Sequence, residues 1–147
     1  MSTFVVNKKV GLNYEIMEKR EAGIELIGSE VKSLRNNHGS LTGAYVTIRG
    51  GQAYLINAHI PPYQEKNTPA SYDPYRERKL LFRKKEIAEL IAEGNKKGLT
   101  IVPISVYSKG PKIKLEVALV RGKKKHDKRE TLKKRQVDRD IARDFAL

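Results

Sequence analysis

The charged residues of this 147-residue chain are unevenly distributed, and this restricts the part that can fold around a hydrophobic core. The last 27 residues, Arg121 to Leu147, contain eleven Lys or Arg and five Asp or Glu, about half of the formal net charge of +13. Their few apolar side chains cannot offset the entropy of ordering the segment in solution. We therefore predict a folded domain over residues 1–121 and a basic C-terminal tail over residues 122–147, disordered when free.

The tail nevertheless has a helical pattern. Val137, Ile141 and Phe145 recur at every fourth position, which would align them along one side of a helix. No Gly or Pro follows Gly122, and residues with high helix propensity dominate. These features predict a tail that becomes helical on a polyanionic partner. A tail that stays solvated and only increases solubility is the alternative.

Composition limits the function classes. The pI of about 9.9 indicates a polyanionic partner, nucleic acid before a membrane surface. The absence of cysteine excludes disulfides, thiolate metal ligands and a cysteine nucleophile, and it fits a reducing compartment. No apolar run approaches the ~20 residues needed to span a bilayer, and no signal-peptide pattern is present. We expect a cytoplasmic protein that does not interact with membranes.

Turn residues divide the first 120 residues into short segments that are typical of strands. Gly50-Gly51 supplies the positive φ angles of a tight hairpin turn. Pro103 predicts an edge or a bulge in its strand. Residues 112–120 alternate between charged and apolar side chains, as in a strand with one buried face. We expect six strands: two over residues 14–27 with a turn near Gly23, then residues 44–48, 53–60, 99–107 and 112–120.

Two helices are predicted between these strands. Ser29 is the expected N-cap of the first, which covers residues 30–35 and directs Val31 and Leu34 into the core. The second covers about residues 84–92. Its buried side is expected to consist of Ile87, Leu90 and Ile91. Residues 1–13 are expected to form a loose basic arm and the proline-rich residues 61–78 a long exposed loop.

These elements predict a mainly β protein with some α structure. Short strands joined by hairpins, with two or three short helices, fit a small closed antiparallel barrel of the oligonucleotide-binding (OB) type. Closure removes exposed strand edges, and the outer strands and loops offer a basic face. An open antiparallel sheet with two packed helices is the alternative.

No pattern in the sequence indicates catalysis. The three histidines, His38, His59 and His126, lie far apart and lack zinc-ligand spacing. No Gly-x-Ser-x-Gly elbow or phosphate-binding glycine loop is present. We therefore expect a binding protein that is not an enzyme and has no metal, cofactor or small-molecule substrate.

The basic residues of the folded domain occur in two groups. Lys112, Lys114, Arg121, Lys123 and Lys124 are expected to converge along the outer face and exit of the last strand. Arg76, Arg78, Lys79 and Arg83 precede the second helix. Together they predict a surface that follows RNA phosphates.

Several motifs, in order along nearly the whole chain, resemble those of the SsrA-binding protein (SmpB) family. They are Glu21-Ala22-Gly23-Ile24, Glu30-Val31-Lys32-Ser33-Leu34-Arg35, residues 53–60, Asp73-Pro74, Arg78-Lys79-Leu80-Leu81 and residues 121–129. The resemblance implies an OB-type barrel that binds transfer-messenger RNA (tmRNA, SsrA RNA) and delivers it to stalled ribosomes for trans-translation, the rescue and tagging of the nascent chain. A ribosomal or ribosome-assembly protein with a similar barrel is the alternative.

The resemblance also implies roles for individual residues. The residues matching the family's RNA-binding surface are Glu21, Leu81, Lys112, Lys114, Arg121, Gly122, Lys123 and Lys124. We add Arg78, Lys79 and Arg83 from the basic segment before the second helix, although many members carry Asn where this chain has Arg83. The tail motif matches residues that work in the decoding centre, namely His126, Asp127, Lys128 and Arg129. The expected partners are the tRNA-like domain of tmRNA and small-subunit rRNA, bound by a monomer, with the distal tail helix along the empty mRNA path.

Overall fold

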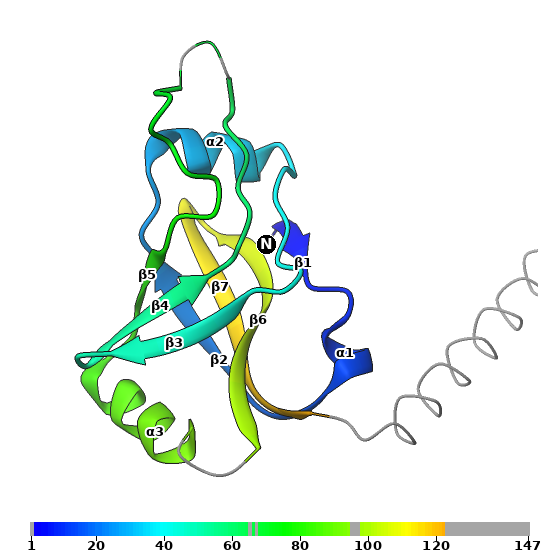
Figure 1. Cartoon of the computed structure of the whole chain (residues 1–147), viewed down its shortest axis with the longest axis vertical. Helices are drawn as coiled ribbons and strands as arrows, with labels where there is room; N and C mark the ends of the chain where they lie inside the picture. Colours follow the sequence, from blue (N-terminus) through cyan, green and yellow to red (C-terminus); the bar gives the residue numbers. More distant parts are fainter. Residues whose placement is uncertain (1, 65, 67, 95–97, 123–147) are drawn as a thin grey trace, which may run out of the picture.

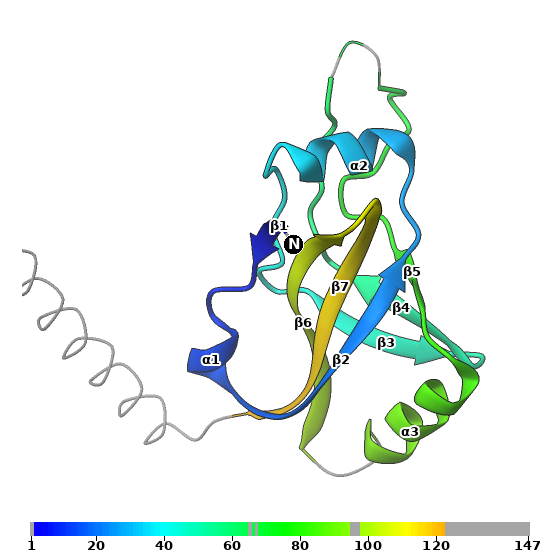
Figure 2. The ribbon, with the colours of Figure 1, turned by 180° about the vertical axis from the view of Figure 1, so that it is seen from behind.

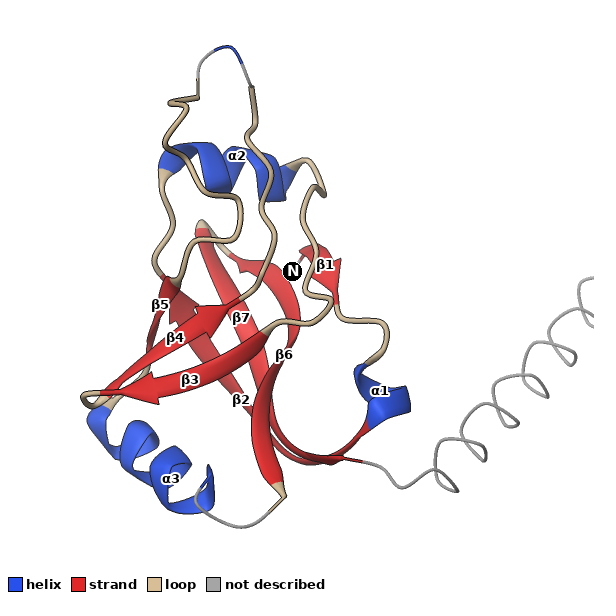
Figure 3. Cartoon of the chain, viewed as in Figure 1, coloured by secondary structure: helices blue, strands red, loops and turns tan. Residues whose placement is uncertain are grey.

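A computed structural model describes residues 2–64, 66, 68–94 and 98–122 of the chain (Figure 1). The predictions for residues 123–147, including the tail helix and the decoding-centre motif, lie outside the described residues. The described elements are strands and three short helices (Figure 3). In chain order they are β1 Ser2–Val6, α1 Val10–Asn13, β2 Tyr14–Ile24, α2 Gly28–Arg35, β3 Tyr45–Arg49, β4 Gln52–Ile56, β5 Arg78–Leu81, α3 Lys84–Gly94, β6 Leu99–Lys109 and β7 Lys112–Gly122.

The strands form one antiparallel sheet that closes on itself. Their order is β1-β6-β3-β4-β5-β2-β7, and β7 also pairs with β6 along its length. This second pairing completes a ring of six strands, with β1 added to β6 outside it. The predicted closed barrel of the OB type with short helices is therefore confirmed, and the open-sheet alternative is wrong.

The helices lie at the ends and side of the barrel. In two opposite views, α2 lies at one end with the described residues of the loop between β4 and β5, and α3 lies at the other end (Figures 1 and 2). The interior is filled by aliphatic side chains from the strands and from α2, including Leu34, Leu55, Leu80 and Leu115, each 1% exposed or less. Leu34 is thus a core residue as predicted, whereas Val31 is only half-buried.

Residues 2–13 form β1 and α1 on the barrel rather than the predicted loose arm. β1 pairs with β6, and Val10 of α1 packs on a second apolar cluster with Val102, Ala118 and Val120. The alternation in β7 predicted only one buried face. The outer face of its second half is also buried, because α1 covers it.

The segment around Gly23 differs from the prediction of two strands and a turn. β2 is one eleven-residue strand that pairs with β7 over most of its length and with β5 at its end. A Cβ atom on Gly23 would lie 3.1 Å from Cβ of Leu81, so the glycine permits close packing against β5.

The other predicted turns are confirmed with small changes. Gly50 and Gly51 have φ angles of 55° and 73° in the β3–β4 hairpin. The register of β6 shifts between Pro103 and Ser105, although the strand continues to Lys109.

In α3, Ile87 and Leu90 are buried, but Ile91 is 41% exposed, so its predicted burial is wrong.

Candidate nucleic-acid interface

Four of the predicted RNA-binding residues surround one surface hollow. Glu21 of β2, Leu81 of β5, Arg83 before α3 and Lys114 of β7 line a space of about 630 Å³, which we call the Glu21 hollow. Its other lining residues are Arg20, Gly23, Phe82, Lys85, Glu86 and Glu89. Residues separated by up to 94 positions along the chain, from Arg20 to Lys114, therefore meet at this site.

The register of three strands explains this meeting. Gly23 pairs with Leu81 on one side and with Lys114 on the other, because β2 lies between β5 and β7. Directly paired residues share a face of the sheet, so Leu81 and Lys114 flank Gly23 on the outer face. Leu81 is 49% exposed and offers an apolar contact within a charged surface.

Glu21 is held in place by side chains from β6. The hydroxyl of Tyr107 donates a hydrogen bond to Glu21 Oε2, and Lys109 Nζ lies 3.3 Å from Oε1. The hydrogen bond from Tyr107, with Lys109 and Lys114 nearby, holds the pKa of Glu21 below its usual value. Burial and the hydrogen bond to Glu21 raise the pKa of Tyr107. At neutral pH the site therefore presents a carboxylate among cations.

The wall of the hollow is fastened by contacts to α3. Arg20 forms ion pairs with Glu18 of its own strand and with Glu89 of α3, at 2.9 and 2.8 Å. The backbone N–H of Arg83 donates to Glu86 Oε1 at 3.2 Å, which stabilises the start of the helix. This hydrogen bond fixes the backbone of Arg83 beside the hollow, while its side chain is exposed.

The expected convergence of cations along β7 is wrong. Lys112 and Lys114 lie at the start of the strand, whereas Arg121 and Gly122 lie at its end. At ~3.3 Å per residue, Lys114 and Arg121 are roughly 23 Å apart along the strand. Arg121 pairs with Glu15 at 2.6 Å, beside the point where Gly122 pairs with Tyr14. The described members of this predicted group on β7 therefore lie in two separate patches.

Arg78 does not belong to either patch. Its side chain is fully buried and donates to Glu30 Oε2 from Nε at 2.9 Å and from a terminal nitrogen at 2.6 Å. The alternation of β5 directs Arg78 and Leu80 inward, and Lys79 and Leu81 outward. The prediction that Arg78 contacts RNA is therefore wrong, whereas Lys79 remains on the outer side of β5 beside the Glu21 hollow.

Glu30 is the centre of a buried charged cluster. It also accepts hydrogen bonds from Arg76 Nε at 3.0 Å and from the N–H of Ile27 at 3.0 Å, and the Tyr72 hydroxyl lies 3.1 Å from it. Burial alone would raise the pKa of Glu30, but the hydrogen bonds from Arg76, Ile27 and Arg78 outweigh it and lower the pKa. Through Tyr72 and Arg76, the cluster connects the segment before β5 to α2. Because Glu30 and Arg78 are fully buried, we assign this pair a structural role.

Comparison with known proteins identifies the family. The model of the SmpB protein family matches residues 4–146. The chain belongs to the SmpB family. It is 50% identical over 137 residues to the SsrA-binding protein of Microcystis aeruginosa, covering 93% of this chain and 89% of that protein. It is 49% identical over 140 residues to the SsrA-binding protein of Mesoplasma florum, covering 95% and 94%.

A solved structure is also similar. The SmpB-family fold described here aligns, with a TM-score of 0.69 and 39% identity, with a chain from a structure described as "tmRNA-SmpB: a journey to the center of the bacterial ribosome". The alignment covers 86% of this chain and 92% of that chain. The likeness therefore extends over the barrel rather than a single motif.

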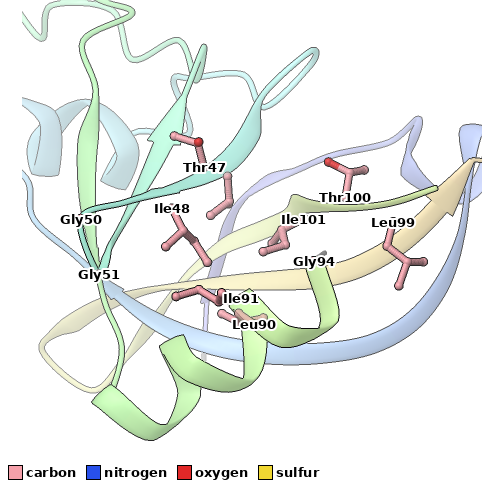
Figure 4. Close-up of a pocket in the computed structure, with 11 residues that line it drawn as sticks. Thr47, Ile48, Gly50, Gly51, Leu90, Ile91, Gly94, Leu99, Thr100 and Ile101 are labelled. Atoms are coloured by element: carbon pink, nitrogen blue, oxygen red, sulfur yellow. The ribbon is translucent and has the colours of Figure 1, made fainter. Parts of the chain in front are cut away.

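A second hollow on this SmpB-family barrel has different chemistry. It lies between the β3–β4 turn, α3 and the start of β6, and has a volume of about 360 Å³ (Figure 4). Ile48, Ile91 and Leu99 point into it, and the residues that line it within the described part of the chain are uncharged. Its described lining is thus mostly apolar, in contrast to the charged lining of the Glu21 hollow.

Two further properties of the described residues bear on function. No group of three or more His, Asp or Glu side chains in the described part of the chain could hold a metal ion. No helix over the same residues is long and apolar enough to cross a membrane. The geometry of the Glu21 hollow instead suits a ligand with both phosphates and hydrogen-bond donors.

Sequence reasoning missed Tyr107 and Lys109. Both are on β6, and they reach Glu21 across the intervening strand β7, where Tyr107 pairs with Lys114 and Glu21 with Glu116. No spacing along the chain reveals such a contact, because it depends on the register of three strands. The inward direction of Arg78 was equally hidden, because each face of the sequence Arg78-Lys79-Leu80-Leu81 carries one basic residue and one leucine.

Proposed function

We propose that this chain binds tmRNA through the Glu21 hollow and delivers it to stalled ribosomes for trans-translation, as a binding protein of the cytoplasm that is not an enzyme. The observation that carries the proposal is the meeting of Glu21, Leu81 and Lys114 around one hollow. The same three residues match the RNA-binding surface of the family, and relatives at about 50% identity are SsrA-binding proteins.

The chemistry of the hollow supports a folded RNA as the ligand. Lys114, Arg83 and Lys85 provide cations for phosphates, and Lys79 and Lys112 extend this charge over the neighbouring outer strands. Leu81 supplies an apolar contact and Glu21 an acceptor, neither of which attracts a phosphate. A surface with all three types of group recognises shape and donors as well as charge. This favours one particular RNA over any polyanion.

The second patch and the tail would contact other parts of the complex. Arg121 and Gly122 end the last strand, so the proposed boundary between body and tail is at residues 121 and 122. We assign Lys123 and Lys124 to RNA binding and residues 126–129 to the small-subunit rRNA of the decoding centre, as the family resemblance implies. A helix over Val137, Ile141 and Phe145 would then lie in the empty mRNA path. One protein monomer would act with one tmRNA.

RNA binding is tested with the tRNA-like domain of tmRNA as probe. The parent protein should bind it more tightly than a tRNA or an unrelated hairpin of equal length. Lys114→Ala should weaken binding and reduce the slope of log K against log salt by roughly 0.7–0.9 for each phosphate that is no longer neutralised. Lys8→Ala, which removes an exposed charge before α1 and away from the hollow, is the control. Equal affinity for all three RNAs would contradict the proposal.

The tail is tested by truncation after His126. The shortened protein should bind the tRNA-like domain with nearly parental affinity, because the body holds the Glu21 hollow. Tagging of a stalled nascent chain should be abolished. His126→Ala in the full chain should reduce tagging more than RNA affinity. If the ring stacks on one rRNA base, its loss costs about 1–3 kcal/mol of binding free energy at that contact. Proportional decreases in affinity and tagging would show that the tail has no separate function.

The alternative, a ribosomal or ribosome-assembly protein, predicts a different ligand. Such a protein would bind an rRNA segment and remain with ribosomes in cells that lack tmRNA. Affinity purification of the full chain, followed by sequencing of the bound RNA, separates the two. Enrichment of rRNA without tmRNA would favour the alternative.

A further inference from the structure

Glu21 has the wrong charge for attracting RNA. It is an anion, 37% exposed at its side chain, on a surface that we propose binds a polyanion. Its negative charge repels phosphates, so any favourable contribution must come from hydrogen bonds that its oxygens accept. The donors on RNA are the N–H groups of base edges and the 2′-hydroxyl groups of riboses.

An exposed glutamate can take many rotamers, and fixing it on binding reduces affinity. Here the carboxylate is already fixed. Tyr107 is 8% exposed, so its ring has little freedom, and its hydroxyl donates to Oε2. Lys109 approaches the other oxygen, Oε1, at 3.3 Å.

We infer that Tyr107 and Lys109 are positioning residues that hold the Glu21 carboxylate ready to accept hydrogen bonds from N–H or O–H groups of the bound RNA. This inference rests on the proposed function. Each carboxylate oxygen has two acceptor positions, so one hydrogen bond from Tyr107 or Lys109 leaves room for a second donor. The contacts from β6 therefore orient Glu21 without saturating it.

The two positioning residues differ in rigidity. Lys109 is 60% exposed and reaches Glu21 with a long, flexible side chain, so solvent weakens its ion pair. Tyr107 is only 8% exposed, so its ring is held by its neighbours and brings its hydroxyl to one place. Removal of the Tyr107 hydroxyl should therefore weaken RNA binding through Glu21 more than removal of the Lys109 ammonium group does.

The test is a double-mutant cycle with the tRNA-like domain of tmRNA as probe. Tyr107→Phe removes only the hydroxyl and should weaken binding roughly three- to tenfold, the cost of ordering one flexible side chain. Glu21→Ala should weaken it more. In the Glu21→Ala background, Tyr107→Phe should have no further effect, because nothing remains to be positioned. The salt slope should stay at the parental value throughout, since every cation that neutralises a phosphate is still present.

Tyr72→Phe is the matched control. It removes another hydroxyl beside a carboxylate, Glu30, but in the buried cluster, so RNA affinity should remain parental. Denaturant unfolding of each variant establishes that the protein is folded under binding conditions. If Tyr107→Phe binds like the parent, or if its effect adds fully to that of Glu21→Ala, the inference is wrong, although the proposed function stands. Failure of the parent itself to prefer the tRNA-like domain would instead contradict the proposed function.

The source of the donor is found with modified RNA. Inosine in place of guanosine removes a base amino group, and single 2′-deoxy substitutions remove ribose hydroxyls. The contacted group is the one whose removal weakens binding to the parent but not to Glu21→Ala. If no single substitution discriminates between the two proteins, Glu21 does not accept a hydrogen bond from the RNA and the inference is wrong.

Discussion

Two glutamates of this barrel have similar partners and opposite surroundings. Glu30 and Glu21 each contact a tyrosine hydroxyl and basic side chains, and the pKa of each lies below the usual value. Glu30 and its partner Arg78 are fully buried, whereas Glu21 and Lys109 are 37% and 60% exposed. The same set of groups therefore stabilises the fold in one place and remains available for a ligand in the other. Accessibility, rather than partner type, separates the structural carboxylate from the binding one.

The largest effect is expected from breaking the buried cluster. Glu30→Gln would leave Arg78 without its counter-charge in the interior, which costs about 3–5 kcal/mol of the free energy of unfolding. The measurement is urea denaturation. Glu77→Gln is the control, because it breaks the Arg49–Glu77 pair, whose side chains are 55% and 50% exposed, and should cost at most about 1 kcal/mol. Equal destabilisation by the two variants would contradict the assigned structural role of Glu30.

A second variant tests the same end of the barrel without changing charge. Leu34 lies one turn after Glu30 in α2 and is 1% exposed, so Leu34→Ala should cost about 2–5 kcal/mol. Ile91→Ala removes a comparable aliphatic side chain from α3 where it is 41% exposed, and should cost much less. A destabilisation below about 0.5 kcal/mol for Leu34→Ala in urea denaturation would show that α2 does not pack as described.

The pH dependence of stability should depend on the buried glutamate. A carboxyl group with a lowered pKa in the folded state stabilises the fold above its unfolded pKa, near 4.5, and loses this contribution as the pH falls through the folded value. The free energy of unfolding should therefore decrease as the pH is lowered below about 5. The decrease should be smaller in Glu30→Gln under conditions where that variant folds. If Glu30→Gln loses stability with falling pH as steeply as the parent protein, Glu30 is not the group responsible.

The smallest effect tests the shape of the exposed site. Gly23→Ala adds a methyl group 3.1 Å from Cβ of Leu81, so β5 must shift by a few tenths of an ångström. We expect a modest decrease in affinity for the tRNA-like domain with little change in stability. Gly28→Ala, where an added Cβ meets no atom within 4 Å, is the control. Equal affinity of both variants would show that the Leu81 position is not critical.

The sequence predicted the local features of the fold and missed those that depend on strand register. The Gly50-Gly51 hairpin, the irregularity at Pro103 and the α2 core residue Leu34 follow from turn chemistry and periodicity over a few residues. The ordered N-terminus could not be predicted, because Val10 is buried only where α1 meets β6 and β7. Nor could the clustering of Glu21, Leu81 and Lys114 be derived from spacing; it came from the family resemblance. The charge of Arg78 predicts an RNA contact, but its inward direction in β5 excludes one.

The central claim is that Glu21 binds RNA as a hydrogen-bond acceptor, and a pair of charge-matched variants tests it most directly. Glu116 pairs with Glu21 across β2 and β7, so Glu21→Ala and Glu116→Ala remove the same charge from neighbouring positions. Electrostatics alone predicts that both variants bind the tRNA-like domain of tmRNA more tightly than the parent, because each makes the surface more positive. We predict that Glu116→Ala binds at least as tightly as the parent, and that Glu21→Ala binds roughly tenfold or more weakly, because hydrogen bonds to a charged group are removed. Tighter binding by both variants would contradict the claim.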